Sequence, residues 1–168
     1  MSQIDKSFLN MAGEFFVAAE LNRRKILSSV TYGASKSADI YAFSFNSKKI
    51  IKIEVKTTDK KKWPIGTKIL DKSTWSKDIF WVFVLLPPFL NNATPNDAVR
   101  GRSSPRYFIL SSLEVGKLAL KSHKRYSSKY QERHGKPYDK VGVPNLTILE
   151  VSRHEAKWDK ITKKLQKS

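Results

Sequence analysis

The stretch from Ile50 to Thr58 constrains the fold more than any other part of this chain. Apolar and charged residues alternate along it, which is the period-two pattern of a half-buried β-strand. Residues two apart leave a strand on the same face, so Glu54 and Lys56 are expected side by side, about 7 Å apart. A carboxylate and an ammonium group at one spot could hold a divalent metal and a water.

A second candidate strand, Asp39 to Phe45, comes shortly before this stretch. It follows a loop of small residues that begins at Gly33. If the two strands pair as a hairpin about residues 46–48, Asp39 comes within reach of Glu54. A lone Asp at the start of a strand is usually a turn residue. Asp39 is therefore of interest because of its neighbours.

The N-terminal region predicts a helix from Ser7 to Lys25. Its apolar residues recur at helical spacing and give a broad apolar face. Glu14 lies at the edge of that face, whereas Glu20 is about 120° away around the helix, so one site cannot receive both. Glu14 is either an ordinary solvated glutamate or a carboxylate directed toward the strands.

The rest of the chain predicts strands alternating with helices. The apolar run from Ile79 to Leu86 is typical of a strand buried on both faces. Capping-box spacing at Ser111 and Glu114 predicts a helix that runs to about Lys124. The same spacing at Ser152 and Glu155 predicts a final helix. The other expected strands are Ile26–Thr31, Tyr107–Leu110 and Leu146–Val151. This pattern indicates one α/β domain, residues 1–168, with a small mixed sheet flanked by helices.

Charge points to a polyanionic partner. The 168 residues include 32 Lys and Arg against 15 Asp and Glu, a net charge of +17. Self-repulsion of this size favours binding to nucleic acid, ahead of an anionic membrane or an acidic protein. Basic loops are expected at Asp59–Lys77, Asn91–Pro105 and Tyr126–Lys140. Trp63 and Trp75 in the first loop either stack on bases or fold onto the core. The residues expected to contact nucleic acid are Arg23, Arg24, Lys36, Lys60, Lys61, Lys62, Trp63, Arg100, Arg102, Tyr130, Arg133 and Lys136.

Several functional classes are excluded or disfavoured by the sequence. The chain has no cysteine, which excludes disulfides and cysteine-based zinc sites. It has neither a signal-peptide pattern nor an apolar run long enough for a membrane span, so a soluble, cytoplasmic protein is expected. His123, His134 and His154 lack paired metal-ligand spacing and are expected to be surface residues or to lie near a phosphate. No glycine-rich phosphate loop is present, which disfavours nucleotide-driven chemistry.

The residues singled out above suit phosphodiester hydrolysis. A divalent cation held by Asp39 and Glu54 would lower the pKa of a bound water and offset charge on the reacting phosphate. Lys56 could orient that water or stabilise the transition state. Glu14 is a possible further carboxylate. Glu-x-Lys alone is a weak signal, because it is common in strands.

The order of these features resembles the PD-(D/E)xK nuclease superfamily: a helix with Glu, a loop, an Asp, a hairpin and Glu-x-Lys. Residues Met11 to Thr58 carry the resemblance, and Ala12 to Arg24 looks like the first helix of small bacterial members. The layout is also similar to that of archaeal Holliday-junction resolvases. Ala38 stands where the name-giving motif has proline. The resemblance implies a restriction-endonuclease-like fold with a small mixed central β-sheet flanked by α-helices.

The same resemblance implies roles for individual residues. Asp39, Glu54 and the Val55 carbonyl would bind Mg²⁺ or Mn²⁺. Lys56 would act on the nucleophilic water, and Glu14 would support the metal. Because superfamily members commonly cut duplexes as dimers, a homodimer is possible.

The first hypothesis is therefore a Mg²⁺- or Mn²⁺-dependent endonuclease that cuts DNA in repair, recombination, restriction or an interbacterial toxin. One alternative is a basic nucleic-acid-binding module on a nuclease-like fold that does not cut. Another is a nuclease that acts on RNA, because charge and aromatic residues alone do not distinguish the two polymers.

Overall fold

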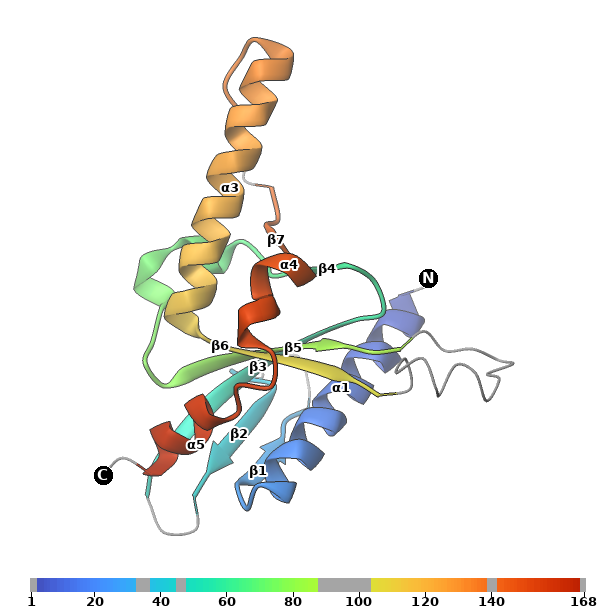
Figure 1. Ribbon diagram of the computed structural model, residues 1–168, viewed down its shortest axis with the longest axis vertical. Coiled ribbons are helices and arrows are strands. Elements are labelled where there is room, and N and C mark those ends of the chain that lie inside the picture. Colours follow the sequence, from blue (N-terminus) through green and yellow to red (C-terminus); the bar gives the residue numbers. More distant parts are fainter. Residues whose placement is uncertain (1–2, 33–36, 45–47, 88–103, 139–141, 167–168) are drawn as a thin grey trace.

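The computed structural model describes residues 3–32, 37–44, 48–87, 104–138 and 142–166. Five strands form one mixed sheet in the order β1-β2-β3-β5-β6, while β4 and β7 pair separately (Figure 1). The expected α/β class with a small mixed sheet is confirmed. The strands are β1 (Leu27–Val30), β2 (Ile40–Phe43), β3 (Ile50–Thr58), β4 (Lys62–Pro64), β5 (Ile79–Leu85), β6 (Arg106–Ser111) and β7 (Asn145–Thr147). The α-helices within the described ranges are α1 (Gln3–Arg23), α3 (Ser112–His134), α4 (Ile148–Val151) and α5 (Asp159–Gln166), and 3₁₀ turns are η1 (Lys68–Leu70), η2 (Lys72–Thr74) and η3 (Ser152–His154).

Strand β3 has partners on both sides. It pairs antiparallel with β2, where Ile53 lies opposite Ile40, and parallel with β5, where Glu54 lies opposite Trp81. The predicted pairing of the Asp39 and Glu54 strands is therefore confirmed, although the turn expected at residues 46–48 lies largely outside the described residues. Ile51, Ile53 and Val55 are buried and the charged positions between them are half-buried, as the alternation predicted.

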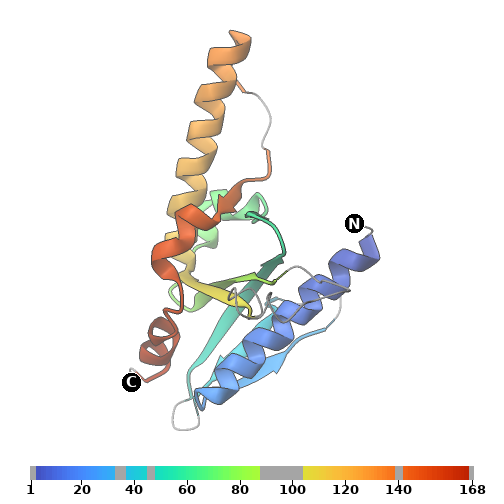
Figure 2. The same ribbon diagram turned by 45° about the vertical axis from the view of Figure 1, so that its right-hand side comes forward.

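The sheet separates two hydrophobic cores. One core joins the Ile53 face of β3 to α1 and α5, and the other lies beneath α3, β4 and β7. Strand β5 contributes to both, since Val82 belongs to the first core and Phe83 to the second. The double-sided burial predicted for this apolar strand is confirmed. Figure 2 shows α1 and α3 on either side of the sheet.

Helix α1 comes close to β3 at Gly13. A Cβ atom built on Gly13 would lie 1.8 Å from Oγ1 of Thr57 and 2.9 Å from its Cβ. No side chain fits there without movement of the helix or the strand. Gly13 therefore sets how close the α1 carboxylate at position 14 comes to the sheet.

We expect Gly13→Ala to destabilise the protein by about 1–3 kcal/mol because of overpacking. This sign is diagnostic, since Gly→Ala inside an unobstructed helix stabilises by roughly 0.5–1 kcal/mol. Urea unfolding measures the difference. Adding Thr57→Ala should recover part of the loss by removing Oγ1 and Cγ2, and no recovery would mean that the two residues are not in contact.

Two expectations for the middle of the chain need correction. Segment Asp59–Lys77 is not one irregular loop, because it contains β4 and two 3₁₀ turns. Trp63 is fully buried and its indole N–H donates to the Val84 carbonyl at 3.0 Å. Trp75 packs against Gly116 and donates to the Ile69 carbonyl. Both tryptophans therefore fold onto the core, the second of the two alternatives predicted for them.

Helix α3 is longer than expected, running to His134 and not to Lys124, so most of the expected loop Tyr126–Lys140 is helical. The capping box predicted at Ser111 and Glu114 is confirmed. Ala119 is the last buried residue of the helix. Residues 120–134, which we call the arm, extend beyond the sheet in both ribbon views (Figures 1 and 2).

The arm is stabilised by rings of its own. Tyr138, on the segment that returns toward the sheet, contacts Tyr126 and Tyr130 with ring-centre distances of 5.0 Å each. The His134 ring packs at a tilt against Tyr130, with 4.4 Å between the ring centres. These contacts hold the returning segment against the arm, far from either core.

The C-terminal region also differs from expectation. The expected strand Leu146–Val151 is divided between β7 and α4, and the capping box belongs to Thr147 and Glu150 in place of Ser152 and Glu155. Thr147 accepts from the Glu150 N–H and caps the short helix α4 five residues before the expected cap at Ser152, while the final helix, α5, begins only at Asp159.

His154 is buried, contrary to the surface position expected for it, with 5% of its surface exposed. Its Nδ1 lies 2.9 Å from Lys160 Nζ and 3.8 Å from Glu114 Oε1, and Arg153 donates to its Nε2. Burial lowers the pKa of His154, and the charges of Lys160 and Arg153 lower it further against the opposing effect of Glu114. The folded protein thus favours the neutral ring.

We expect stability to fall as the pH drops below about 6.5, the ordinary pKa of histidine. The folded pKa of His154 is depressed, so the unfolded chain takes up protons first and is favoured in acid. Denaturant unfolding between pH 7.5 and 5.5 measures this loss. His154→Gln should reduce the pH dependence, whereas His134→Gln, at an exposed position, should retain it. Equal slopes in both variants would contradict the assignment.

None of the helices in the described ranges is both long enough and apolar enough to cross a membrane.

Candidate active site

Asp39 is held beside Glu54 by hydrogen bonds to both of its neighbours. The Asp39 N–H donates to the Ile53 carbonyl at 3.1 Å, and Asp39 Oδ2 accepts from the Val55 N–H at 2.7 Å. Strand β2 begins at Ile40, so the bond from Val55 to the Asp39 side chain extends the hydrogen bonding between the two segments beyond the first residue of β2. Asp39 is only 7% exposed. This carboxylate is therefore positioned by the β3 backbone itself.

Glu54 and Lys56 occupy the polar face of β3. Lys56 Nζ lies 4.0 Å from Glu54 Oε2, and both side chains are about one-third exposed, at 34% and 27% respectively. Lys56 Nζ also lies 5.6 Å from the Trp81 ring centre. A partly exposed ion pair contributes at most about 1 kcal/mol to stability. A contribution to fold stability therefore does not explain why Glu54 and Lys56 are placed together.

Both side chains line a pocket of about 810 Å³. Helix α1 contributes Asn10 to the lining and α3 contributes Ser112, and the segment from β4 to η2 closes another side, so the pocket lies where several elements meet. Trp81 also lines it, and its indole N–H is buried without a hydrogen-bond acceptor among the described residues. An oxygen of a bound ligand could satisfy this donor. The sequence did not predict that Trp81 lines the pocket, because the pattern around it indicates only a buried strand.

Glu14 is not a solvated glutamate. It is 8% exposed and lies three residues before the buried Val17 and four after the pocket residue Asn10. Residues three and four apart share one side of a helix. The side of α1 that carries Glu14 is thus the side that faces the sheet and borders the pocket.

The donors expected for a divalent cation are only partly assembled. Within the described part of the chain, no three His, Asp or Glu side chains form a group that could hold a metal ion. Asp39 and Glu54 nevertheless lie on adjacent strands. A residue's N–H and C=O project to the same side of a strand, so the Val55 carbonyl faces the edge that Asp39 occupies. Two carboxylates and a carbonyl are oxygen donors that suit Mg²⁺ or Mn²⁺, and Mg²⁺ typically takes one or two protein carboxylates and keeps several waters. The donor set fits.

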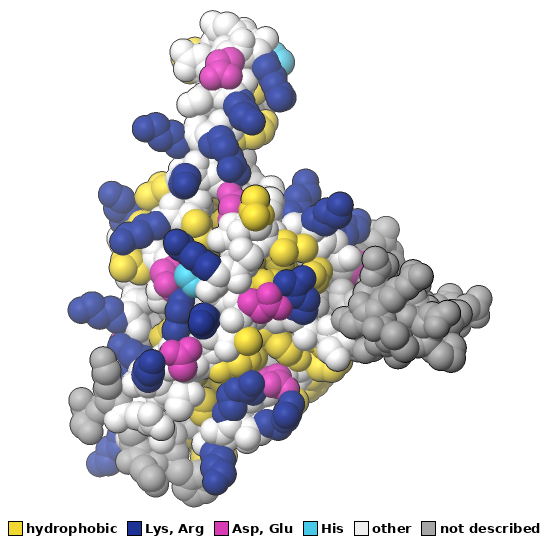
Figure 3. Space-filling view, in the orientation of Figure 1, with side chains coloured by type: hydrophobic (Ala, Val, Ile, Leu, Met, Phe, Trp, Pro, Cys, Tyr) yellow, Lys and Arg dark blue, Asp and Glu magenta, His cyan; other side chains and the backbone are white. Residues whose placement is uncertain are grey.

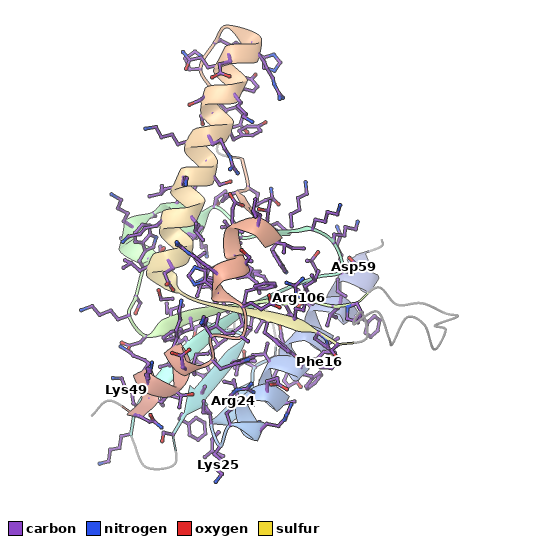
Figure 4. The ribbon with its side chains drawn as sticks, viewed as in Figure 1. Phe16, Arg24, Lys25, Lys49, Asp59 and Arg106 are labelled. Carbon is purple, nitrogen blue, oxygen red and sulfur yellow. The ribbon has the colours of Figure 1, made fainter. Side chains whose placement is uncertain are left out.

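Arg23 and Arg24 are already engaged within the protein. Both bond to Glu20, and the Arg24 guanidinium lies 4.7 Å from the Trp158 ring centre. Burial acts to raise the pKa of Glu20, but hydrogen bonds from Arg24 and Arg23 bring it below the ordinary value. Arg24 is seen at the α5 side of α1 in Figure 4. Contact of these arginines with phosphate stays a prediction.

The other residues expected to bind nucleic acid lie in different settings. Trp63 offers no ring face to a base because it is fully buried, so we remove it from the set. Tyr130 packs against His134 of the arm and Tyr138 of the returning segment. Lys36, Arg100 and Arg102 lie outside the described residues. The remaining members are exposed, and they are Lys60, Lys61, Lys62, Arg133 and Lys136.

No protein-family model matches the chain, and no curated protein sequence matches it either.

We expect Asp39→Ala to destabilise the protein by about 1–3 kcal/mol, because the Val55 N–H loses its buried acceptor. Asp39→Asn should cost less, since the amide oxygen can still accept this bond. Thermal or urea unfolding compares the two variants. Equal losses would show that the Val55 bond is not what fixes Asp39.

Proposed function

We propose that this protein is a metal-dependent endonuclease that hydrolyses phosphodiester bonds in DNA, with the PD-(D/E)xK layout. The observation that carries the proposal is the meeting of Asp39, Glu54 and Lys56 at the polar face of β3, beside a pocket that Glu54 and Lys56 line. These are a carboxylate bound to the β3 backbone, a second carboxylate, and an ammonium group 4.0 Å from it.

Each residue has a distinct task in this proposal. Asp39, Glu54 and the Val55 carbonyl would hold Mg²⁺ or Mn²⁺. When bound, such a cation supplies Lewis acidity that offsets charge developing on the phosphoryl oxygens. Lys56 donates to the attacking water or to a phosphoryl oxygen, and its proximity to Glu54 keeps the ammonium charge at the polar face of β3. Glu14 adds negative charge on the sheet-facing side of α1.

The net charge of +17 supports a nucleic-acid substrate. The same charge would also serve a module that binds without cutting, and a nuclease that acts on RNA. The carboxylates favour hydrolysis, because a protein that only binds phosphates gains nothing from negative charge in its pocket. The homodimer and the cytoplasmic location stay predictions.

We expect purified protein to cut supercoiled plasmid and four-way-junction DNA with Mg²⁺ or Mn²⁺ and not with EDTA. Glu54→Gln and Lys56→Met should each reduce the cleavage rate at least about 100-fold, since the first removes a carboxylate that would hold the metal and the second removes the group that acts on the water or the phosphoryl oxygen. Gel assays of initial rates measure the effect.

Lys52→Met is the matched control for Lys56→Met. Lys52 is a half-buried lysine on the same strand and face but does not line the pocket, so its replacement should leave cleavage near the wild-type rate. Salt-sensitive binding without cleavage under any metal would favour the non-cleaving module. Cleavage of structured RNA in preference to DNA would favour the RNA alternative.

A further inference from the structure

Positive charge alone does not indicate which part of a nucleic acid the candidate active site receives. Figure 3 shows Lys and Arg side chains spread over the whole face in view, the arm included. A net charge of +17 distributed in this way attracts phosphate at many places. The pocket beside Glu54 and Lys56 is more informative, because its size and its walls limit what can enter it.

The pocket continues beyond Glu54 and Lys56 along an apolar wall. Ile79 and Trp81 of β5 form part of this wall. The Trp81 ring centre is 5.6 Å from Lys56 Nζ, so the wall begins within reach of the lysine that we assign to the phosphate. Ser112 also lines the pocket and is only 1% exposed, whereas the Lys56 side chain is 34% exposed. The pocket therefore reaches below the surface at which Lys56 meets solvent.

The volume of the pocket suits one nucleotide and excludes a base-paired stack. At about 810 Å³ it falls within the range of small-molecule sites, roughly 300–1,000 Å³. A compact space of this volume is about 9 Å across, narrower than the roughly 12 Å major groove of B-DNA alone. A paired duplex lying over the pocket would leave the apolar wall uncovered. A single base turned out of the stack would cover it.

The walls carry the kinds of group that bind an extruded base. Enzymes that receive such a base hold it between aromatic or apolar side chains and read its edge by hydrogen bonds. Here Thr67 and Ser112 add hydroxyl groups to the lining, and each hydroxyl can donate or accept. The buried indole N–H of Trp81 is a further donor that has no acceptor among the described residues. The pocket thus combines apolar contact with polar groups able to bond to a base edge.

A second lysine lines the pocket from a different wall. Lys68 of η1 is exposed and lines the pocket together with Lys56 of β3. A nucleotide turned out of a strand keeps a phosphate on each side, because it rotates about a backbone that continues in both directions. Lys56 is assigned to one of these phosphates in the proposed reaction. Lys68 can bind the other.

We propose that the pocket receives one nucleotide turned out of the base stack next to the bond that is cut, with Lys68 on its second phosphate. The substrate class is then DNA with an unpaired or mismatched nucleotide at that position, because such bases leave the stack at the lowest cost. This inference rests on the proposed function for the roles of Glu54 and Lys56. Occupation of the pocket is itself testable without cleavage.

The first test compares Thr67→Trp with Ser73→Trp. Both positions are exposed and lie in the segment from β4 to η2, but only Thr67 lines the pocket. Thr67 makes no side-chain capping bond to η1, so its replacement removes none there. The larger ring at position 67 occupies the space that we assign to the base. The same ring at position 73 leaves that space open.

Binding is measured by fluorescence anisotropy in EDTA, so that cleavage plays no part. The probes are a 24-base-pair duplex and the same duplex with one unpaired adenosine. The wild type should prefer the second by at least about tenfold, because apolar contact with one base contributes on this order. Thr67→Trp should lose the preference and Ser73→Trp should keep it. A single strand of the same sequence shows whether the unpaired nucleotide must lie within a duplex.

The second test compares Lys68→Gln with Lys72→Gln. Both variants lose one positive charge at an exposed position, but Lys72 does not line the pocket. For the duplex with the unpaired adenosine, the plot of log K against log salt should be less steep by about 0.9 in Lys68→Gln, because one phosphate contact is lost. Lys72→Gln should keep the wild-type slope. This pair adds no bulk, so it tests the pocket even where Thr67→Trp does not fold.

Equal binding of the two duplexes by the wild type, or no binding of either, would overturn the proposal. So would an equal preference in the two tryptophan variants, or equal slopes in the two glutamine variants. Cleavage by a wild type that shows no binding preference would reject the nucleotide pocket and leave the nuclease intact. A preference that Thr67→Trp abolishes, without cleavage under any metal, would support the pocket and reject the nuclease.

Discussion

The pairing of β3 on both edges is the constraint on which the rest of the structure depends. Its apolar residues face the core beneath α1 and α5, whereas Glu54 and Lys56 face the pocket. A slip of one residue would exchange the two faces and place Glu54 in the core. The burial of Ile51 and Ile53 therefore fixes the register that also positions the carboxylate. Core packing and site geometry are two results of one alignment.

Local sequence patterns were sufficient to predict the elements in which burial follows the periodicity of the sequence. The alternation from Ile50 to Thr58 indicates a strand with one buried face. The continuous apolar run at β5 indicates a strand with two buried faces. Capping at Ser111 depends on side chains three residues apart, so it too is readable locally. The approach of Asp39 to Glu54 required only that two adjacent strands pair. The fold class and the outline of the candidate site followed from these features.

Other features depend on residues far apart in sequence, and there the prediction was wrong or absent. The polar sequence after Lys124 gives no sign that Tyr138 will fold back onto Tyr126 and Tyr130, although these contacts support the extra turns of α3. His154 becomes buried only because Glu114 and Lys160 are brought to it. The pocket next to Lys56 likewise draws residues from α1, β5 and α3. The periodicity of the sequence carries no information on contacts between residues that are far apart along the chain.

The ring cluster at the end of the arm has a consequence for how the protein opens. Hydrogen bonds that no core protects break in local fluctuations whose free energy lies below that of global unfolding. Arg125 and Ser122, near the base of the arm, bond to Glu150 and to the Asn145 carbonyl, and beyond them the packing of the arm consists of a few rings. The arm can therefore fray and re-form while the bond from Val55 to Asp39, inside the sheet, stays closed. One continuous helix, α3, in this way joins a locally labile extension to the rigid sheet.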